Sequence, residues 1–193
     1  MEHKDRIYQS DLGEIKKVYQ DTKDWAEVLS RAVHSDCDIS QEAFIDYVEE
    51  VYKTKVKDVK HLQKLTGITH LSGSDGKEAK TEAEAQRFAI KELEEIILAC
   101  KYSKYSTALR DAIESGAKYK DLLAIKPADY GLPEKWSGHA STDQYSTVLF
   151  VISTQFLIYE PQRHRIAPDL RSIADELEAP YSVILEAKIM YDI

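Results

Sequence analysis

The chain closes on RIAPDLRSIADELEAPYSVILEAKIMYDI, residues 165–193, whose apolar spacing predicts two short helices joined by a tight turn. In the first helix Ala174 is small enough for a close helix crossing, and Ile173 and Leu177 flank it as core positions. The turn and the second helix add the predicted core residues Ala179, Ile184 and Ala187. A preceding apolar segment completes a predicted three-helix unit over residues 145–193.

This arrangement resembles a helix-turn-helix. Together with LFVISTQFLIYEPQRHRIAPDL, residues 149–170, the segment is similar to the winged transcriptional regulators of the MarR type. The resemblance implies that the last helix occupies the place of a DNA recognition helix. Two features depart from it: Glu178 stands where the turn usually holds glycine, and no β-hairpin wing follows before Ile193.

The last helix has the wrong side chains for a duplex groove. In this register its presented positions are Tyr181, Ser182, Leu185, Glu186 and Ile189. Base edges are usually read by Arg, Lys, Asn or Gln, and cations supply the phosphate contacts, whereas Lys188 is the one cation of this helix. We therefore interpret Tyr181, Leu185, Glu186 and Ile189 as a protein-binding surface. The leading hypothesis is a non-catalytic regulatory or adaptor protein that binds another protein or itself.

Three alternatives remain open at this stage. A DNA-binding regulator would contact phosphates with Arg163, Arg165 and Arg171 beside the motif. An RNA or single-strand binder would use the basic, tyrosine-rich segment 101–126, including Lys118 and Lys120, because cations hold phosphates and ring faces stack on bases.

The third alternative is an inhibitor that mimics nucleic acid with an acidic surface. The chain has a net charge of −8, and its first hundred residues hold 15 Lys and Arg against 21 Asp and Glu. A negative net charge disfavours nonspecific attraction to phosphate backbones.

No catalytic residue, metal ligand set or cofactor motif is predicted. The cluster of His34, Asp36 and Asp38 lacks the spacing of a calcium loop, and acids there are more typical of helix capping.

Helical periodicity extends along most of the chain and predicts an all-α multi-helix bundle. One long helix is expected over residues 12–32, and two separate helices before and after residues 101–105. The stretch SGSDGKEAK, residues 72–80, is predicted to be a flexible linker between an N-terminal unit (1–71) and a C-terminal domain (81–193).

The bulk composition is that of a globular protein in a reducing compartment. The residues are 43% hydrophobic and 31% charged, and no apolar run is longer than Val148 to Ile152, which is too short for a membrane span. The first residues are charged where a secretory signal would be apolar, and Cys37 and Cys100 form no disulfide framework. A cytoplasmic location is the expectation.

Overall fold

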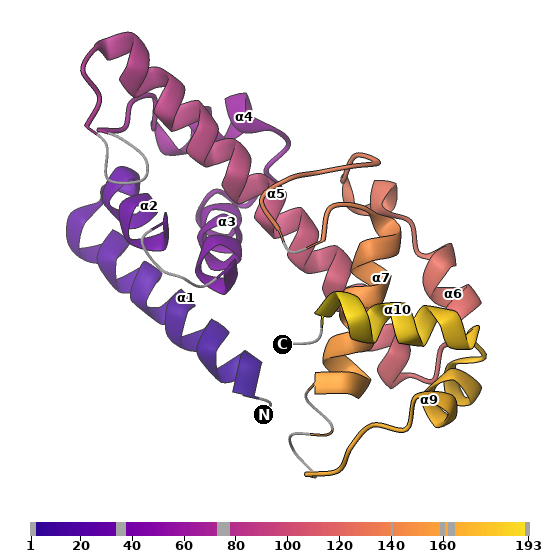
Figure 1. Cartoon of the computed structure of the whole chain (residues 1–193). Coiled ribbons are helices and arrows are strands. Elements are labelled where there is room, and N and C mark those ends of the chain that lie inside the picture. The colour runs from indigo at the N-terminus through magenta and orange to yellow at the C-terminus, as the bar shows by residue number, and fades with distance from the viewer. Residues whose placement is uncertain are drawn as a thin grey trace. The chain divides into compact units, whose positions relative to one another are not determined.

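The computed structural model describes residues 3–33, 38–72, 78–139, 141–158, 161 and 165–191. Within these residues the chain forms nine α-helices and no β-strand, which confirms the predicted all-α multi-helix fold (Figure 1). The helices are α1 His3–Thr22, α2 Trp25–Val33, α3 Asp38–Tyr52, α4 Val59–Thr66, α5 Glu82–Glu114, α6 Tyr119–Ala124, α7 Gln144–Ile152, α9 Leu170–Leu177 and α10 Tyr181–Tyr191. A 3₁₀ helix, η1 (Pro127–Tyr130), and a π-helix, η2 (Ser153–Ile158), complete the elements.

The chain divides into two compact units, Met1–Ser103 and Lys104–Ile193, and the boundary falls inside α5. The sequence placed the division at residues 72–80, of which 73–77 lie outside the described residues. The difference has a physical cause. The N-terminal part of α5 buries side chains in the core of the first unit and so belongs to that unit; these residues are Ala89, Leu93, Ile96 and Cys100.

The core of the first unit is built around aromatic side chains of α1, α2 and α3. Trp25 is 4% exposed; its ring stacks on Tyr19 at 4.0 Å between centroids and meets Phe44 edge-on at 5.9 Å. The Trp25 indole nitrogen donates a 2.9 Å hydrogen bond to the hydroxyl of Tyr52. Because a buried indole N–H needs an acceptor, this bond removes the main cost of burying the ring.

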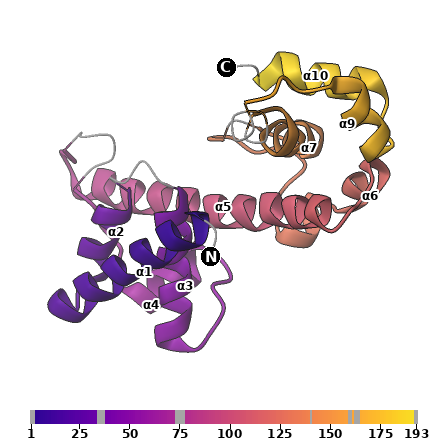
Figure 2. The ribbon, with the colours of Figure 1, turned by 90° about the horizontal axis from the view of Figure 1, so that it is seen from below.

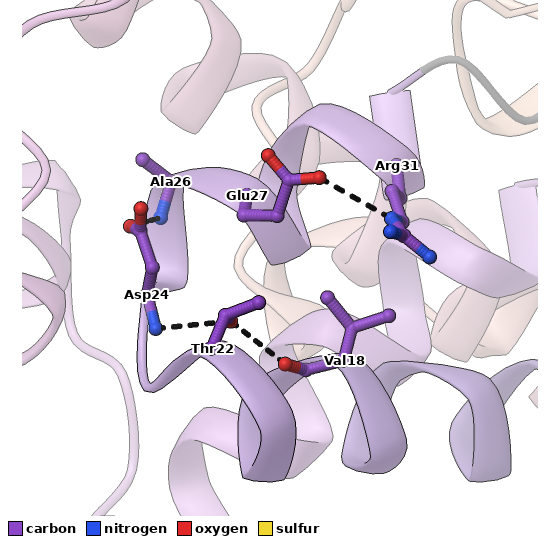
Figure 3. A network of polar contacts seen from close by, with 6 residues as sticks. All are labelled: Val18, Thr22, Asp24, Ala26, Glu27 and Arg31. Atoms are coloured by element: carbon purple, nitrogen blue, oxygen red, sulfur yellow. Dashed lines mark hydrogen bonds and ion pairs between the residues drawn. The ribbon is translucent and has the colours of Figure 1, made fainter.

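The predicted single helix over residues 12–32 is wrong, because the chain breaks into α1 and α2 at Lys23 and Asp24 (Figure 3). Lys23 takes a left-handed conformation with φ 52°. The Thr22 hydroxyl donates to the Val18 carbonyl at 2.7 Å and accepts from the Asp24 amide at 3.2 Å. Asp24 then begins α2, since its carboxylate accepts from the Ala26 amide at 2.9 Å. These side chains satisfy backbone groups that a helix end leaves unpaired.

The two helices predicted around residues 101–105 are instead one helix, α5. The apolar pattern changes phase there. Leu93 and Cys100 are buried with the first unit, whereas Tyr105 and Leu109 are buried in the second. At 3.6 residues per turn the buried face rotates by about half a turn between Cys100 and Leu109. Such a change in the position of the apolar residues has the same appearance in the sequence as the end of one helix and the start of another. No Gly or Pro interrupts the helix backbone.

In the second unit α10 packs against α7, η2 and α9 (Figures 1 and 2). The apolar stretch from Ser146 to Ile158 is helical, as expected for the segment that precedes the two terminal helices, and continues from α7 into η2. The irregular connection before α7 is fixed by Trp136, which is 7% exposed and donates its indole N–H to the Ser141 carbonyl at 2.8 Å. The Trp136 ring also meets Tyr105 edge-on at 6.4 Å.

Candidate functional site

The turn between α9 and α10 is held by backbone and side-chain caps. The Asp169 carboxylate accepts from the amides of Arg171 and Ser172 and so begins α9. The helix ends at Glu178, which lies in the left-handed region with φ 50° and ψ 41°. This is the position where the resemblance calls for glycine, and a glutamate adopts the conformation here at a cost of about 1 kcal/mol.

The residues expected in the core of this helix pair are buried. Relative exposures lie between 0% and 8% for Ile173, Ala174, Leu177, Ile184 and Ala187, and Ala179 is half-buried. Val183, at 8%, joins them. The buried side of α10 therefore faces α7 and α9, and the opposite side of the helix faces solvent.

The exposed side of α10 is apolar. Tyr181 is 40% exposed, Leu185 38% and Ile189 70%, and they follow one another at four-residue intervals. We call these three residues the α10 stripe. Met190, 49% exposed, lies beside it and was not picked out from the sequence. Of the eight large apolar side chains that are exposed in the described part of the chain, four lie on this eleven-residue helix.

Glu186 lies beside the stripe and is held in place by α7. The Tyr145 hydroxyl donates a 2.6 Å hydrogen bond to its carboxylate. This bond, together with burial and the negative charge of Glu186, raises the pKa of Tyr145 to about 12. α10 is tied to α7 a second time through Tyr191, whose hydroxyl donates to the Ser146 carbonyl at 2.9 Å. All four residues assigned to protein binding from the sequence are thus exposed on α10: Tyr181, Leu185, Glu186 and Ile189.

Arg171, on α9, contacts the stripe. Its guanidinium lies 4.9 Å from the centroid of the Tyr181 ring, within the range of a cation–π contact. The stripe is therefore flanked by a carboxylate that Tyr145 holds and by a guanidinium that rests on Tyr181.

Among the other residues assigned to nucleic-acid binding, Lys118 makes contacts within the fold. Lys118 donates from its ammonium group to the Glu176 carbonyl at 2.8 Å and lies 4.0 Å from the Glu178 carboxylate, so it stabilises the end of α9. Lys120 and Arg165 are exposed, and Arg163 lies outside the described residues.

Two of the tyrosines of segment 101–126 are buried, and a third is partly buried. Tyr105 is 0% exposed and Tyr102 9%, while Tyr119 is half-buried. Base stacking requires an accessible ring face. Tyr105 packs on Tyr130 and Trp136 and so belongs to the core of the second unit.

The described residues contain no group of three or more His, Cys, Asp or Glu side chains arranged to hold a metal ion. His34 and Asp36 lie outside them. One open pocket of ≈ 470 Å³ lies at the end of α3, and its lining is Asp46, Glu49, Glu50, Lys53, Thr54 and Lys55. Its carboxylates are already engaged within the fold: Asp46 accepts from the Tyr8 hydroxyl, and Glu49 pairs with Lys55 at 2.9 Å.

In the part of the chain that the structure describes, no helix has the length and apolarity needed to cross a membrane. Comparison of the chain with protein-family models, with curated proteins and with solved structures found no significant match.

Proposed function

We propose that this chain is a non-catalytic regulatory or adaptor protein that binds another protein through the α10 stripe. The observation that carries the proposal is the exposure of Tyr181, Leu185 and Ile189 on one side of a helix whose other side is fully packed. A helix that presents apolar side chains one turn apart is a recurrent mode of protein recognition.

The composition of the face agrees with that of protein interfaces. Their centres are enriched in Tyr, Met and Arg and depleted in Lys and Asp, with polar groups at the rim. Here Tyr181 and Met190 supply the large side chains, and Arg171 and Glu186 stand at the edge.

The same composition counts against a duplex in contact with α10. Glu186 would bring a carboxylate close to phosphates, and the 70% exposed Ile189 offers no hydrogen bond to a base edge. Arg171 and Arg165 are exposed cations that would support DNA binding. The test therefore distinguishes a protein partner from a nucleic-acid partner.

The test compares two variants of matched exposure in extracts of the native cells. Leu185→Arg places a charge in the stripe, where Leu185 is 38% exposed, and Ile90→Arg does the same on α5, where Ile90 is 41% exposed. The unmodified chain should migrate in a nuclease-resistant assembly larger than its 22.1 kDa. Leu185→Arg should release the monomer, and Ile90→Arg should not.

Circular dichroism of both purified variants shows whether each is folded, and Leu185→Ser replaces the first variant if the arginine disturbs α10. An assembly that nuclease dissolves would establish a nucleic-acid partner and refute the proposal. A chain that migrates as a monomer before any substitution would refute it as well.

A further inference from the structure

The chain has one methionine besides Met1, and this residue is exposed on α10 beside the α10 stripe. Met190 is 49% exposed and directly follows Ile189, the most exposed residue of the stripe. The next residue, Tyr191, donates the 2.9 Å hydrogen bond to the Ser146 carbonyl on α7. Because this bond fixes the end of α10, the exposure of Met190 is a property of the folded helix and not of a frayed end.

Met190 is also the exposed one of the two sulfur-containing residues whose burial the structure describes. Cys100 is 4% exposed and lies in the core of the first unit. Oxidation of sulfur in a protein follows the accessibility of the side chain. Peroxides should therefore react at Met190 before they react at Cys100.

We propose that Met190 is a modification site, where oxidation to the sulfoxide by hydrogen peroxide releases the protein partner of the α10 stripe. The inference rests on the proposed function, that the stripe binds protein. In the reaction the thioether sulfur attacks one peroxide oxygen, and an S–O bond forms as the O–O bond breaks. The sulfur loses two electrons, the peroxide gains them, and the second oxygen leaves with both protons as water.

The sulfoxide weakens binding because it makes an apolar contact polar. A thioether buried against a partner is favourable, since its burial removes apolar area from water. A sulfoxide oxygen is a hydrogen-bond acceptor, and its burial without a donor costs free energy. The neighbour one turn earlier is Glu186, whose carboxylate accepts hydrogen bonds, and the Tyr145 hydroxyl already donates to it at 2.6 Å. These two neighbours therefore give the sulfoxide no donor.

The first arm of the test needs no partner. The purified full chain is treated with dilute hydrogen peroxide, and mass spectrometry of its peptides follows the addition of oxygen at Met190 and Cys100. We expect Met190 to react about as fast in the native chain as in the denatured chain, and Cys100 to react only after denaturation. A Met190 that is protected in the native chain, or a Cys100 that reacts first, overturns the inference.

The second arm adds the oxidised chain, freed of peroxide, to extracts of native cells that lack it. The oxidised chain should join the nuclease-resistant assembly at least about tenfold more weakly than the untreated chain. Methionine sulfoxide reductase, which reverses the modification, should restore the assembly. Met190→Leu, which stays apolar and has no sulfur, should assemble equally well with and without peroxide treatment.

A further variant imitates the oxidised state. Met190→Gln places a polar carbonyl near the position of the sulfoxide and should weaken the assembly without any peroxide, while circular dichroism shows the chain to be folded. If peroxide treatment weakens Met190→Leu as much as the unmodified chain, or if the reductase restores nothing, the inference is refuted.

The outcomes separate this inference from the proposed function. If the untreated chain joins an assembly that depends on Leu185 and the oxidised chain joins it equally well, the inference is refuted and the proposed function stands. If the untreated chain joins no assembly, both are refuted.

Discussion

The Tyr145 hydroxyl on α7 and the Glu186 carboxylate on α10 are joined by a 2.6 Å hydrogen bond. The two residues are 41 positions apart in the sequence, and the bond fixes a charged side chain at the edge of the exposed apolar stripe. A charged side chain that is held in place before binding loses less conformational entropy when a partner binds.

This hydrogen bond predicts that the Tyr145 phenol titrates at an unusually high pH. It is the largest of the causes that raise the pKa of Tyr145 from 10.0 to about 12. Because the folded state holds the proton more tightly, the contribution of Tyr145 to stability is complete below pH 10 and is lost as the pH rises to about 12. The ultraviolet titration of the native chain minus that of Tyr145→Phe should give a single phenol with a midpoint near 12.

Glu186→Gln is the matched control for this titration. Removal of the negative charge should lower the pKa of Tyr145 towards 10.0 and leave the remaining tyrosines unaffected, apart from the neighbouring Tyr119. A difference titration centred at the ordinary tyrosine value in the unmodified chain would show that the bond is not formed in solution.

The left-handed conformation of Glu178 predicts a stabilising substitution. Glycine has no Cβ to strain at φ 50°, so Glu178→Gly should raise the free energy of unfolding by about 1 kcal/mol. Its contact with Lys118, at 4.0 Å, is long and exposed and offsets little of this gain. Denaturant unfolding measures the effect. Glu176→Gly, two residues earlier and within α9, should lower the free energy of unfolding by about 0.5–1 kcal/mol. Inside a helix, glycine relieves no strain and loses more backbone entropy on folding than glutamate does.

Lys118 and Lys120, which look alike in the sequence, should behave differently. The Lys118 ammonium donates to the Glu176 carbonyl, 58 residues away in the sequence, at 2.8 Å, whereas Lys120 extends into solvent. Lys118→Met should therefore cost about 0.5–1 kcal/mol of unfolding free energy, and Lys120→Met should lie within experimental error. Equal effects of the two substitutions in chemical denaturation would contradict the assignment of Lys118 to the end of α9.

The break between α1 and α2 gives a prediction in the first unit. Asp24→Ala removes the acceptor of the Ala26 amide and should destabilise the chain by about 1 kcal/mol, while Asp24→Asn should retain most of the cap. Asp21→Ala is the matched control, because Asp21 is exposed on α1 near its end. Thermal unfolding compares the three variants. An Asp24→Ala midpoint no lower than that of Asp21→Ala would mean that Asp24 does not begin α2.

Local sequence signals predicted much of this fold and of its candidate site. Helical periodicity predicted the all-α class, because burial on a helix repeats with its turns. The register of the resemblance to a helix-turn-helix predicted that Tyr181, Leu185 and Ile189 lie on the exposed side of α10. The break at Lys23 also had a signal: Asp24 and Glu27 have the spacing of a capping box, which the longer apolar repeat obscured.

Other features of the fold could not be predicted from neighbouring residues in the sequence. The phase change along α5 imitates a helix end, because the helix buries one face before Cys100 and another at Leu109. The bonds from Tyr145 to Glu186 and from Lys118 to Glu176 join residues that only the folded chain brings together.

The central claim is that the α10 stripe contacts protein. Photo-cross-linking in the native cells tests this claim most directly. A photoreactive residue replaces Ile189, which is the most exposed member of the stripe at 70%. The control carries the same photoreactive residue in place of Ile90. We expect the Ile189 probe to attach covalently to a protein, identified by mass spectrometry, and the Ile90 probe to yield no such product. Attachment of the Ile189 probe to nucleic acid, or to nothing, would contradict the account.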